Sequence, residues 1–180
     1  MDGSDPLKET AKETKSMSWL EKLARKVPGF SGYLDKKERR KADQVIRETI
    51  SSRLEETRKE LGAVSETLSA DIILAIDHAE PLGRADNRLM GLIGKIKDAP
   101  SGYSSFFDAN QVDEATLDQI YMYDSSMIAH VEQIADHTKA VQNAVDMGSY
   151  VGPAIKELDA ILKDANNEIA TRNEIIKGIA

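Results

Sequence analysis

The stretch VIRETISSRLEETRKEL, residues 45–61, decides the fold class of this chain. Its apolar residues recur at spacings of four and seven, and charged or polar side chains fill most of the positions between them. One face of an α-helix collects residues at these spacings, so the stretch predicts an amphipathic helix of a bundle or coiled coil. The apolar residues are Val45, Ile46, Ile50, Leu54 and Leu61.

The same helical periodicity continues on both sides of this stretch. It predicts one helix over 36–80, with a break near Gly62 as the alternative, and a new helix that starts at Pro81. Apolar residues of the run Ile72–Ile76 continue the core stripe of the first helix in this interpretation. Further helices are expected over 113–147 and 153–178.

A shorter amphipathic helix begins at Ser18, which has Glu21 three residues later in the pattern of a capping box, and Pro28-Gly29 ends it. No segment alternates apolar and polar residues as a half-buried strand does. Short connections favour antiparallel neighbours. The predicted fold is therefore all-α: an elongated up-down bundle of about four long helices plus a short N-terminal amphipathic helix. Residues 17–180 are expected to form a single domain, after a disordered tail over 1–16.

Composition excludes several classes of protein. The 180 residues contain no cysteine, so disulfides, zinc–thiolate sites and thiol catalysis are ruled out. The longest apolar run, Ile72–Ile76, is far shorter than the roughly 20 residues that a membrane-spanning helix needs. The polar N-terminus has no apolar core of a secretory signal. These features favour a cytoplasmic protein.

The net charge of −7 is unevenly distributed along the chain. Residues 17–47 carry a net charge of +5, whereas residues 98–180 carry −9. A basic segment on an acidic protein favours an acidic protein partner, an anionic membrane surface or self-association. The alternative is a solvated helix face without a partner.

The basic segment begins with the amphipathic helix. Trp19, Leu20 and Leu23 share its apolar face, and basic residues flank and follow them. Such a helix suits the interface of an anionic membrane. The alternative is that the same apolar side chains close the end of the bundle core. The basic residues in question are Arg25, Lys26, Lys36, Lys37, Arg39, Arg40 and Lys41.

Two further groups of residues are candidate sites. The loop GYSSFFD, residues 102–108, contains Tyr103, Phe106 and Phe107, which would bind a protein partner if exposed or plug the end of the bundle if buried. Separately, His78, His130 and His137 lie on helices rich in carboxylates, as metal ligands of helical bundles do. The Glu-x-x-His pairs of carboxylate-bridged metal bundles are absent, so surface polar residues are the alternative.

Catalysis and nucleic-acid binding have little support. The chain has neither Gly-x-Ser-x-Gly nor a phosphate-binding glycine motif, so no catalytic residue and no cofactor are expected. The run KKERRK, residues 36–41, is basic but has no aromatic residues interleaved with it for stacking on bases. The sequence therefore favours a non-enzymatic protein and disfavours nucleic acid as a partner.

The stretches PGFSGYLDKKERRKADQVIRETISSRL (28–54) and APSGYSSFFD (99–108) resemble a family of small helical prokaryotic proteins of uncharacterised function. The resemblance is close in these two stretches and loose over most of the rest of the chain. The family has no established activity, so the resemblance implies no catalytic residues. Genes of the family lie near genes for stomatin-like membrane-scaffold proteins, and the resemblance therefore implies a membrane-associated assembly with such a scaffold as partner.

Taken together, the residues predict a helical interaction or scaffold protein, cytoplasmic or peripheral to a membrane, that contacts its partner through the basic N-terminal segment. A bundle that binds a metal or small ligand through His and carboxylate side chains is the alternative.

Overall fold

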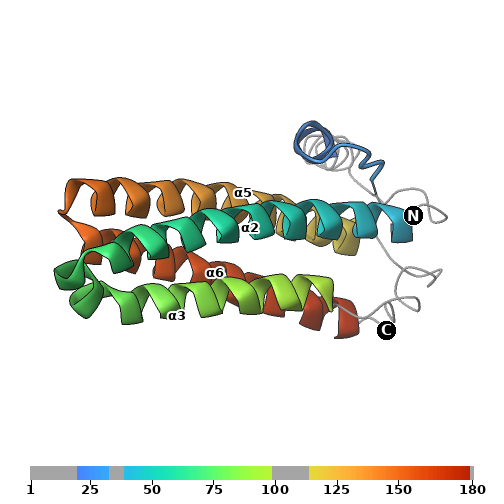
Figure 1. Ribbon diagram of the computed structural model, residues 1–180. Coiled ribbons are helices and arrows are strands. Elements are labelled where there is room, and N and C mark those ends of the chain that lie inside the picture. Colours follow the sequence, from blue (N-terminus) through green and yellow to red (C-terminus); the bar gives the residue numbers. More distant parts are fainter. Residues whose placement is uncertain (1–19, 33–38, 99–113, 179–180) are drawn as a thin grey trace, which may run out of the picture.

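The fold is known from a computed structural model, which describes residues 20–32, 39–98 and 114–178. All regular elements in these ranges are helices (Figure 1). The prediction of an all-α up-down bundle is confirmed. A short helix over 20–26 precedes four long helices, which are α2 (Arg39–Ala70), α3 (Ile72–Lys97), α5 (Glu114–Met147) and α6 (Val151–Gly178).

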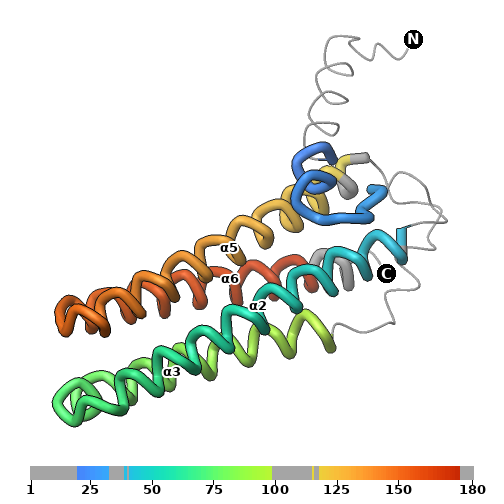
Figure 2. The backbone as a smooth tube through the Cα atoms, turned by 45° about the horizontal axis from the view of Figure 1, so that its top comes forward, coloured from blue at the N-terminus to red at the C-terminus, as the bar shows by residue number. Residues whose placement is uncertain are grey.

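The four long helices form two antiparallel hairpins, α2–α3 and α5–α6, that lie side by side (Figures 1 and 2). α2 packs against α3 and α5, and α6 packs against α3 and α5. As a result α2 runs parallel to α5, and α3 runs parallel to α6. α3 and α5 follow one another in the chain but occupy opposite corners of the bundle, so the rule that neighbours in sequence pack together fails at this connection.

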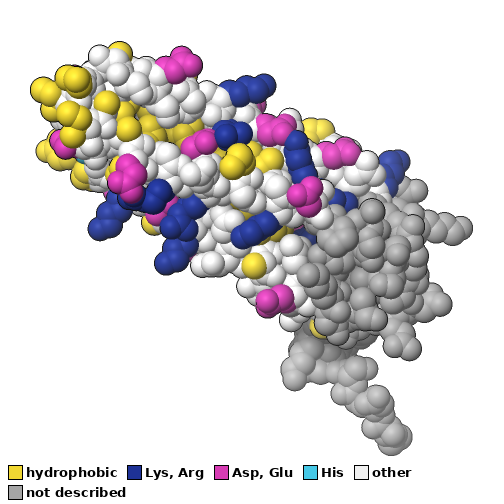
Figure 3. Space-filling model, turned by 60° about the horizontal axis from the view of Figure 1, so that its bottom comes forward, with side chains coloured by type: hydrophobic (Ala, Val, Ile, Leu, Met, Phe, Trp, Pro, Cys, Tyr) yellow, Lys and Arg dark blue, Asp and Glu magenta, His cyan; other side chains and the backbone are white. Residues whose placement is uncertain are grey.

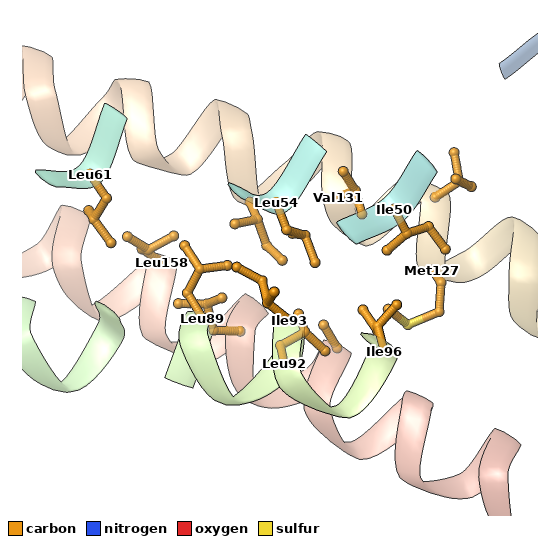
Figure 4. Close-up of a cluster of buried hydrophobic side chains, with 14 of the residues drawn as sticks. Ile50, Leu54, Leu61, Leu89, Leu92, Ile93, Ile96, Met127, Val131 and Leu158 are labelled. Carbon is orange, nitrogen blue, oxygen red and sulfur yellow. The ribbon is translucent and has the colours of Figure 1, made fainter. Parts of the chain in front are cut away.

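The core runs along the middle of the bundle and receives side chains from all four helices (Figure 4). The periodic residues of the stretch 45–61 face it as predicted: Ile46, Ile50, Leu54 and Leu61 are buried, and Val45 packs partly against them. Burial of each such side chain contributes about 1.5–3 kcal/mol. The apolar stripe of α2 packs against buried residues of the other three helices, such as Leu89, Val131 and Leu158 (Figure 4).

The first long helix ends at Ala70, earlier than the sequence suggests. Asp71 has an extended backbone, and its Oδ1 accepts hydrogen bonds from the amides of Ile73 (2.9 Å) and Leu74 (3.2 Å). A side chain that caps a new helix in this way competes with continuation of the old one. The predicted helix over 36–80 is therefore wrong, and so is the alternative break at Gly62, which lies inside α2.

Pro81 lies inside α3, so the prediction that a helix starts there is wrong. Proline has no amide proton, so the carbonyl of Asp77 loses its usual helical hydrogen bond. Packing on both sides of the proline offsets this loss. Leu74 and Ala75 lie partly against the core before it, and Leu82 is fully buried directly after it.

The N-terminal segment 20–32 packs against the beginning of α5 (Figure 2). Phe30 meets the ring of Tyr121 edge to face, with ring centroids 6.3 Å apart and an interplanar angle of 84°. At Gly32, which has a φ of +86°, an added Cβ would lie 2.8 Å from Cδ1 of Leu20. A side chain at this φ is strained, so glycine is favoured at this position.

Candidate interaction surface

Both tight turns of the bundle lie at the same end of the molecule (Figure 1). We name this end, formed by residues 69–81 of the α2–α3 hairpin and 144–155 of the α5–α6 hairpin, the turn end. The two turns approach each other, because a Cβ built on Gly152 would lie 3.5 Å from Cε1 of His78. Residues of both hairpins therefore share one continuous surface.

This surface exposes large apolar side chains. In space-filling view, apolar atoms gather there (Figure 3). Elsewhere in the described part of the chain, the large exposed apolar residues are two methionines on helix sides, Met90 and Met122, and they are about half exposed. Large clustered apolar exposure is uncommon in monomers and marks interaction sites. At the turn end the exposed fractions are 75% for Ile72, 70% for Ile73, 78% for Ile76, 71% for Met147 and 81% for Tyr150.

The most apolar run of the sequence is thus on the surface. Within α3, the fully buried residues begin at Leu82, and 72–81 contains none. The prediction that Ile72 and Ile76 continue the core stripe of α2 is wrong. The break at Asp71 starts a new helix with its own rotational phase, so the earlier periodicity does not carry over.

Tyr150 occupies a position that its side chain does not favour. Its φ is +59°, in the left-handed region, and the carbonyl of Tyr150 accepts a hydrogen bond from the amide of Ala154 (3.2 Å) at the start of α6. A non-glycine residue in the left-handed region costs roughly 1–2 kcal/mol, and glycine or a small polar residue is preferred directly before a helix. Gly148, also at positive φ in this turn, follows the usual preference.

The turn end is also acidic. Residues 69–81 and 144–155 include four carboxylates and neither Lys nor Arg. Glu80 forms an ion pair with Arg84 one turn further along α3. Asp71, Asp77 and Asp146 form no ion pair with any residue that the structure describes. Oδ1 of Asp71 caps α3, and Oδ1 of Asp146 accepts a hydrogen bond from Gln142.

The apolar face of the N-terminal helix, in contrast, points into the bundle. Leu23 is 1% exposed, and Leu20 is partly buried against the same core. Leu23 therefore does not lie on a surface that can touch a lipid or a partner, which corrects that part of the sequence interpretation. The sequence could not distinguish the two, because an apolar helical face looks the same whether it meets the bundle or a membrane. Trp19 is outside the described residues.

The basic residues of the same segment have different environments. Arg39 is 3% exposed, so it cannot act as a surface contact as expected. Arg25 is exposed beside Glu21 (3.7 Å), Nζ of Lys26 lies 2.6 Å from Oε2 of Glu132, and Lys41 is exposed. The other expected contacts lie outside the described residues, or in the case of Arg40 have an undescribed side chain. These are Lys36, Lys37 and Arg40, together with the loop residues Tyr103, Phe106 and Phe107.

A buried ion network, which the sequence analysis missed, lies at the opposite end of the bundle. The guanidinium of Arg172 in α6 donates to Oδ1 of Asp124 in α5 and to Oδ1 of Asp43 in α2, both at 2.8 Å. Oδ2 of Asp43 also accepts from Arg47 at 2.7 Å. The signal was present in the spacing, because Arg172 follows the buried residue Ile169 by three positions. We assign this network a structural role.

The three histidines do not converge. His130 lies 2.6 Å from Glu168, His137 lies 3.8 Å from Glu157, and His78 lies beside Gly152. In the ranges that the structure covers, no three His, Asp or Glu side chains are grouped so that they could hold a metal ion. The metal site that was the alternative interpretation of the sequence is therefore not formed by the described residues.

A groove of about 690 Å³ runs along the outer side of the α2–α3 hairpin, where Gly62 and Gly83 leave open space. Lys59 is one of its lining residues, and two charged pairs lie at its walls. Asp86 holds Arg58 through two hydrogen bonds and raises the pKa of that guanidinium, and Lys97 lowers the pKa of Glu55 through a hydrogen bond and its charge. These four charged groups are already matched within the protein.

Comparison with known proteins adds no functional information: no family model, no curated protein and no solved structure matches this chain. None of the described helices combines the length and the apolar character that crossing a membrane requires. The exposed apolar surface at the turn end is therefore the feature that points to a function.

Proposed function

We propose that this chain is a non-enzymatic interaction or scaffold protein that docks a protein partner through its turn end. The observation that carries the proposal is the cluster of five large apolar side chains, 70–81% exposed, contributed by both hairpins. Removing such side chains from water favours association at roughly 25 cal/mol per Å² of apolar surface. The two packed hairpins behind them bring side chains from both turns onto the same surface.

The basic N-terminal segment is a second, weaker contact in this proposal. Its described apolar residues pack into the core, so the exposed groups that its described part offers to a partner are charged. Arg25 and Lys41 remain exposed and would attract an acidic surface, or an anionic membrane, in a way that salt screens. Membrane association through this segment alone is therefore expected to be weak.

Site-specific photo-crosslinking tests the proposal in the cells that naturally produce the chain. A photoreactive amino acid is placed at Ile73 or Met147 on the turn end, and at Met122 on the side of α5 as the matched control. Adducts with a defined protein should form from the first two positions and not from the third. Adducts that are equally abundant from Met122, or that contain no protein, would overturn the proposal.

A further inference from the structure

We infer that the partner surface is apolar at its centre and bordered by Lys and Arg side chains on another protein. This inference rests on the proposed function and specifies the chemistry of the docked surface. Two properties of the turn end, in addition to its exposed apolar area, support this inference. They are the sign of the surrounding charge and the backbone conformation of Tyr150.

The charge favours one class of occupant. Asp71, Asp77 and Asp146 lie among the exposed isoleucines and Met147 in the sequence, and none of them is neutralised by a described basic residue. Docking removes water from carboxylates at the edge of the contact, which is unfavourable unless cations replace it. Lys and Arg on the partner meet this requirement, and they also increase the rate of encounter.

The same carboxylates disfavour the other occupants of an apolar surface. Two copies that met turn end to turn end would bring Asp77 and Asp146 of each towards carboxylates of the other. An anionic bilayer would repel the same groups, and insertion into a neutral bilayer would desolvate Asp71 and Asp77 next to the isoleucines that enter it. A protein surface with basic residues is the occupant that satisfies both the apolar and the charged parts.

The conformation of Tyr150 supports a contact made by its side chain. Tyr150 is 81% exposed, so it gains little from the bundle in return for the left-handed backbone at this position. Residues held in strained backbone conformations cluster at functional sites. Tyrosine is also enriched among the residues that dominate binding energy at protein interfaces, because it combines a large apolar ring with a polar hydroxyl.

The test uses two synthetic helical peptides as probes. Both carry the same leucine stripe, and lysine flanks the stripe in one peptide whereas glutamate flanks it in the other. Binding to the full chain is measured by fluorescence anisotropy over a series of salt concentrations. The lysine peptide should bind, with affinity that falls as salt increases, and the glutamate peptide should not.

Variants place the binding on the turn end. The double variant Ile73→Ser/Ile76→Ser should bind the lysine peptide at least tenfold more weakly, whereas Met90→Ser/Met122→Ser, which removes apolar side chains from helix sides, should bind within twofold of the parent. Asp77→Asn/Asp146→Asn should flatten the salt dependence. Tyr150→Gly should weaken binding several-fold while the melting temperature stays the same or rises, which separates lost contact from lost folding.

Four results would overturn the inference: equal binding of both peptides, equal binding by the isoleucine double variant, binding of neutral or anionic phospholipid vesicles that depends on Ile73, or a dimer in solution that Ile73→Ser dissociates. Failure of the inference is distinguishable from failure of the proposed function. If crosslinks from Ile73 reach a protein whose contact surface lacks Lys and Arg, the proposed docking function is supported and the inference of a basic partner surface is wrong.

Discussion

Arg172 shows how one polar side chain ties three helices together. It reaches α2 across the diagonal of the bundle and α5 along one side, and all three partners in this contact are nearly inaccessible to water. A buried ion pair contributes little net stability compared with apolar residues of the same size, but loss of one partner leaves a charge in a poor environment. The geometry suggests that the network fixes the register of the helices.

We predict that Arg172→Met lowers the free energy of unfolding by about 3–5 kcal/mol, because the carboxylates of Asp43 and Asp124 lose a buried guanidinium. Arg25→Met, which removes the same charge from an exposed pair with Glu21, should change it little. Urea denaturation measures both. Similar midpoints for the two variants would show that the network is not coupled to folding.

The core positions allow a matched comparison of the same substitution in two environments. Ile50→Asp and Ile128→Asp place a charge in the apolar core and should cost several kcal/mol, comparable with the total stability of a domain. Ile73→Asp introduces the same residue at the exposed start of α3, where a carboxylate is favourable near the helix N-terminus. Thermal unfolding followed by circular dichroism should therefore rank Ile73→Asp close to the parent and the other two far below it.

Among the helices, α3 is divided by its packing. Residues 72–81 have no fully buried side chain, whereas six buried residues follow between Leu82 and Ile96. Pro81 also removes the hydrogen bond that the carbonyl of Asp77 would accept. The first ten residues therefore depend on the partial packing of Leu74 and Ala75, on the helical hydrogen bonds and on the cap at Asp71.

Hydrogen exchange should reveal this division. Amides of 74–80 are predicted to exchange by local opening, at least tenfold faster than amides of 85–96, because opening the first part exposes little buried apolar surface. Mass spectrometry or NMR of exchanging amides measures the difference. Uniform protection along α3 would mean that the exposed run is held as firmly as the core.

The helix boundaries explain what could and could not be predicted from the sequence. The periodicity of Ile46, Ile50 and Leu54 specified the bundle, because burial of one face is the dominant energy of a long amphipathic helix. Local signals were less reliable. Gly62 and Pro81 are strong helix breakers, yet packing overrides both, whereas Asp71 ends a helix within a run that contains neither glycine nor proline.

The candidate surface was missed for the same reason. A run such as Ile72–Ile76 has the composition of a core segment, and only the rotational phase of its helix decides that three isoleucines face water. The phase depends on where Asp71 starts the helix. The proximity of Met147 and Tyr150 depends in turn on how two hairpins distant in sequence pack together, which hydrophobic periodicity does not encode.

For the molecule as a whole, two regions differ in burial. The N-terminal segment packs on the sides of α5 and α2, and its Leu23, Val27 and Phe30 belong to the core. The turn end, in contrast, leaves five large apolar side chains exposed. The N-terminal segment therefore belongs to the packed fold, whereas the proposal places docking at the turn end.

Deletion of residues 1–34 is accordingly predicted to lower the free energy of unfolding by several kcal/mol, since three buried side chains contribute about 1.5–3 kcal/mol each. Deletion of residues 1–16 should leave it unchanged. Urea denaturation of both truncated chains tests this. A wild-type midpoint for the longer deletion would mean that the segment packs on the bundle without supporting it.

The pairing of the two hairpins also predicts what happens when the chain is cut between them. Each hairpin buries its apolar face against the other, and their only link is the segment between Lys97 and Glu114. The first 97 residues carry a net charge of +2 and the remainder −9, so the two pieces attract each other. A chain cut within 99–113 should therefore reassemble from its fragments. The turn end contains Ile73 from one fragment and Tyr150 from the other, so it would form only where both fragments are present. Binding of the partner through the turn end would then require both fragments.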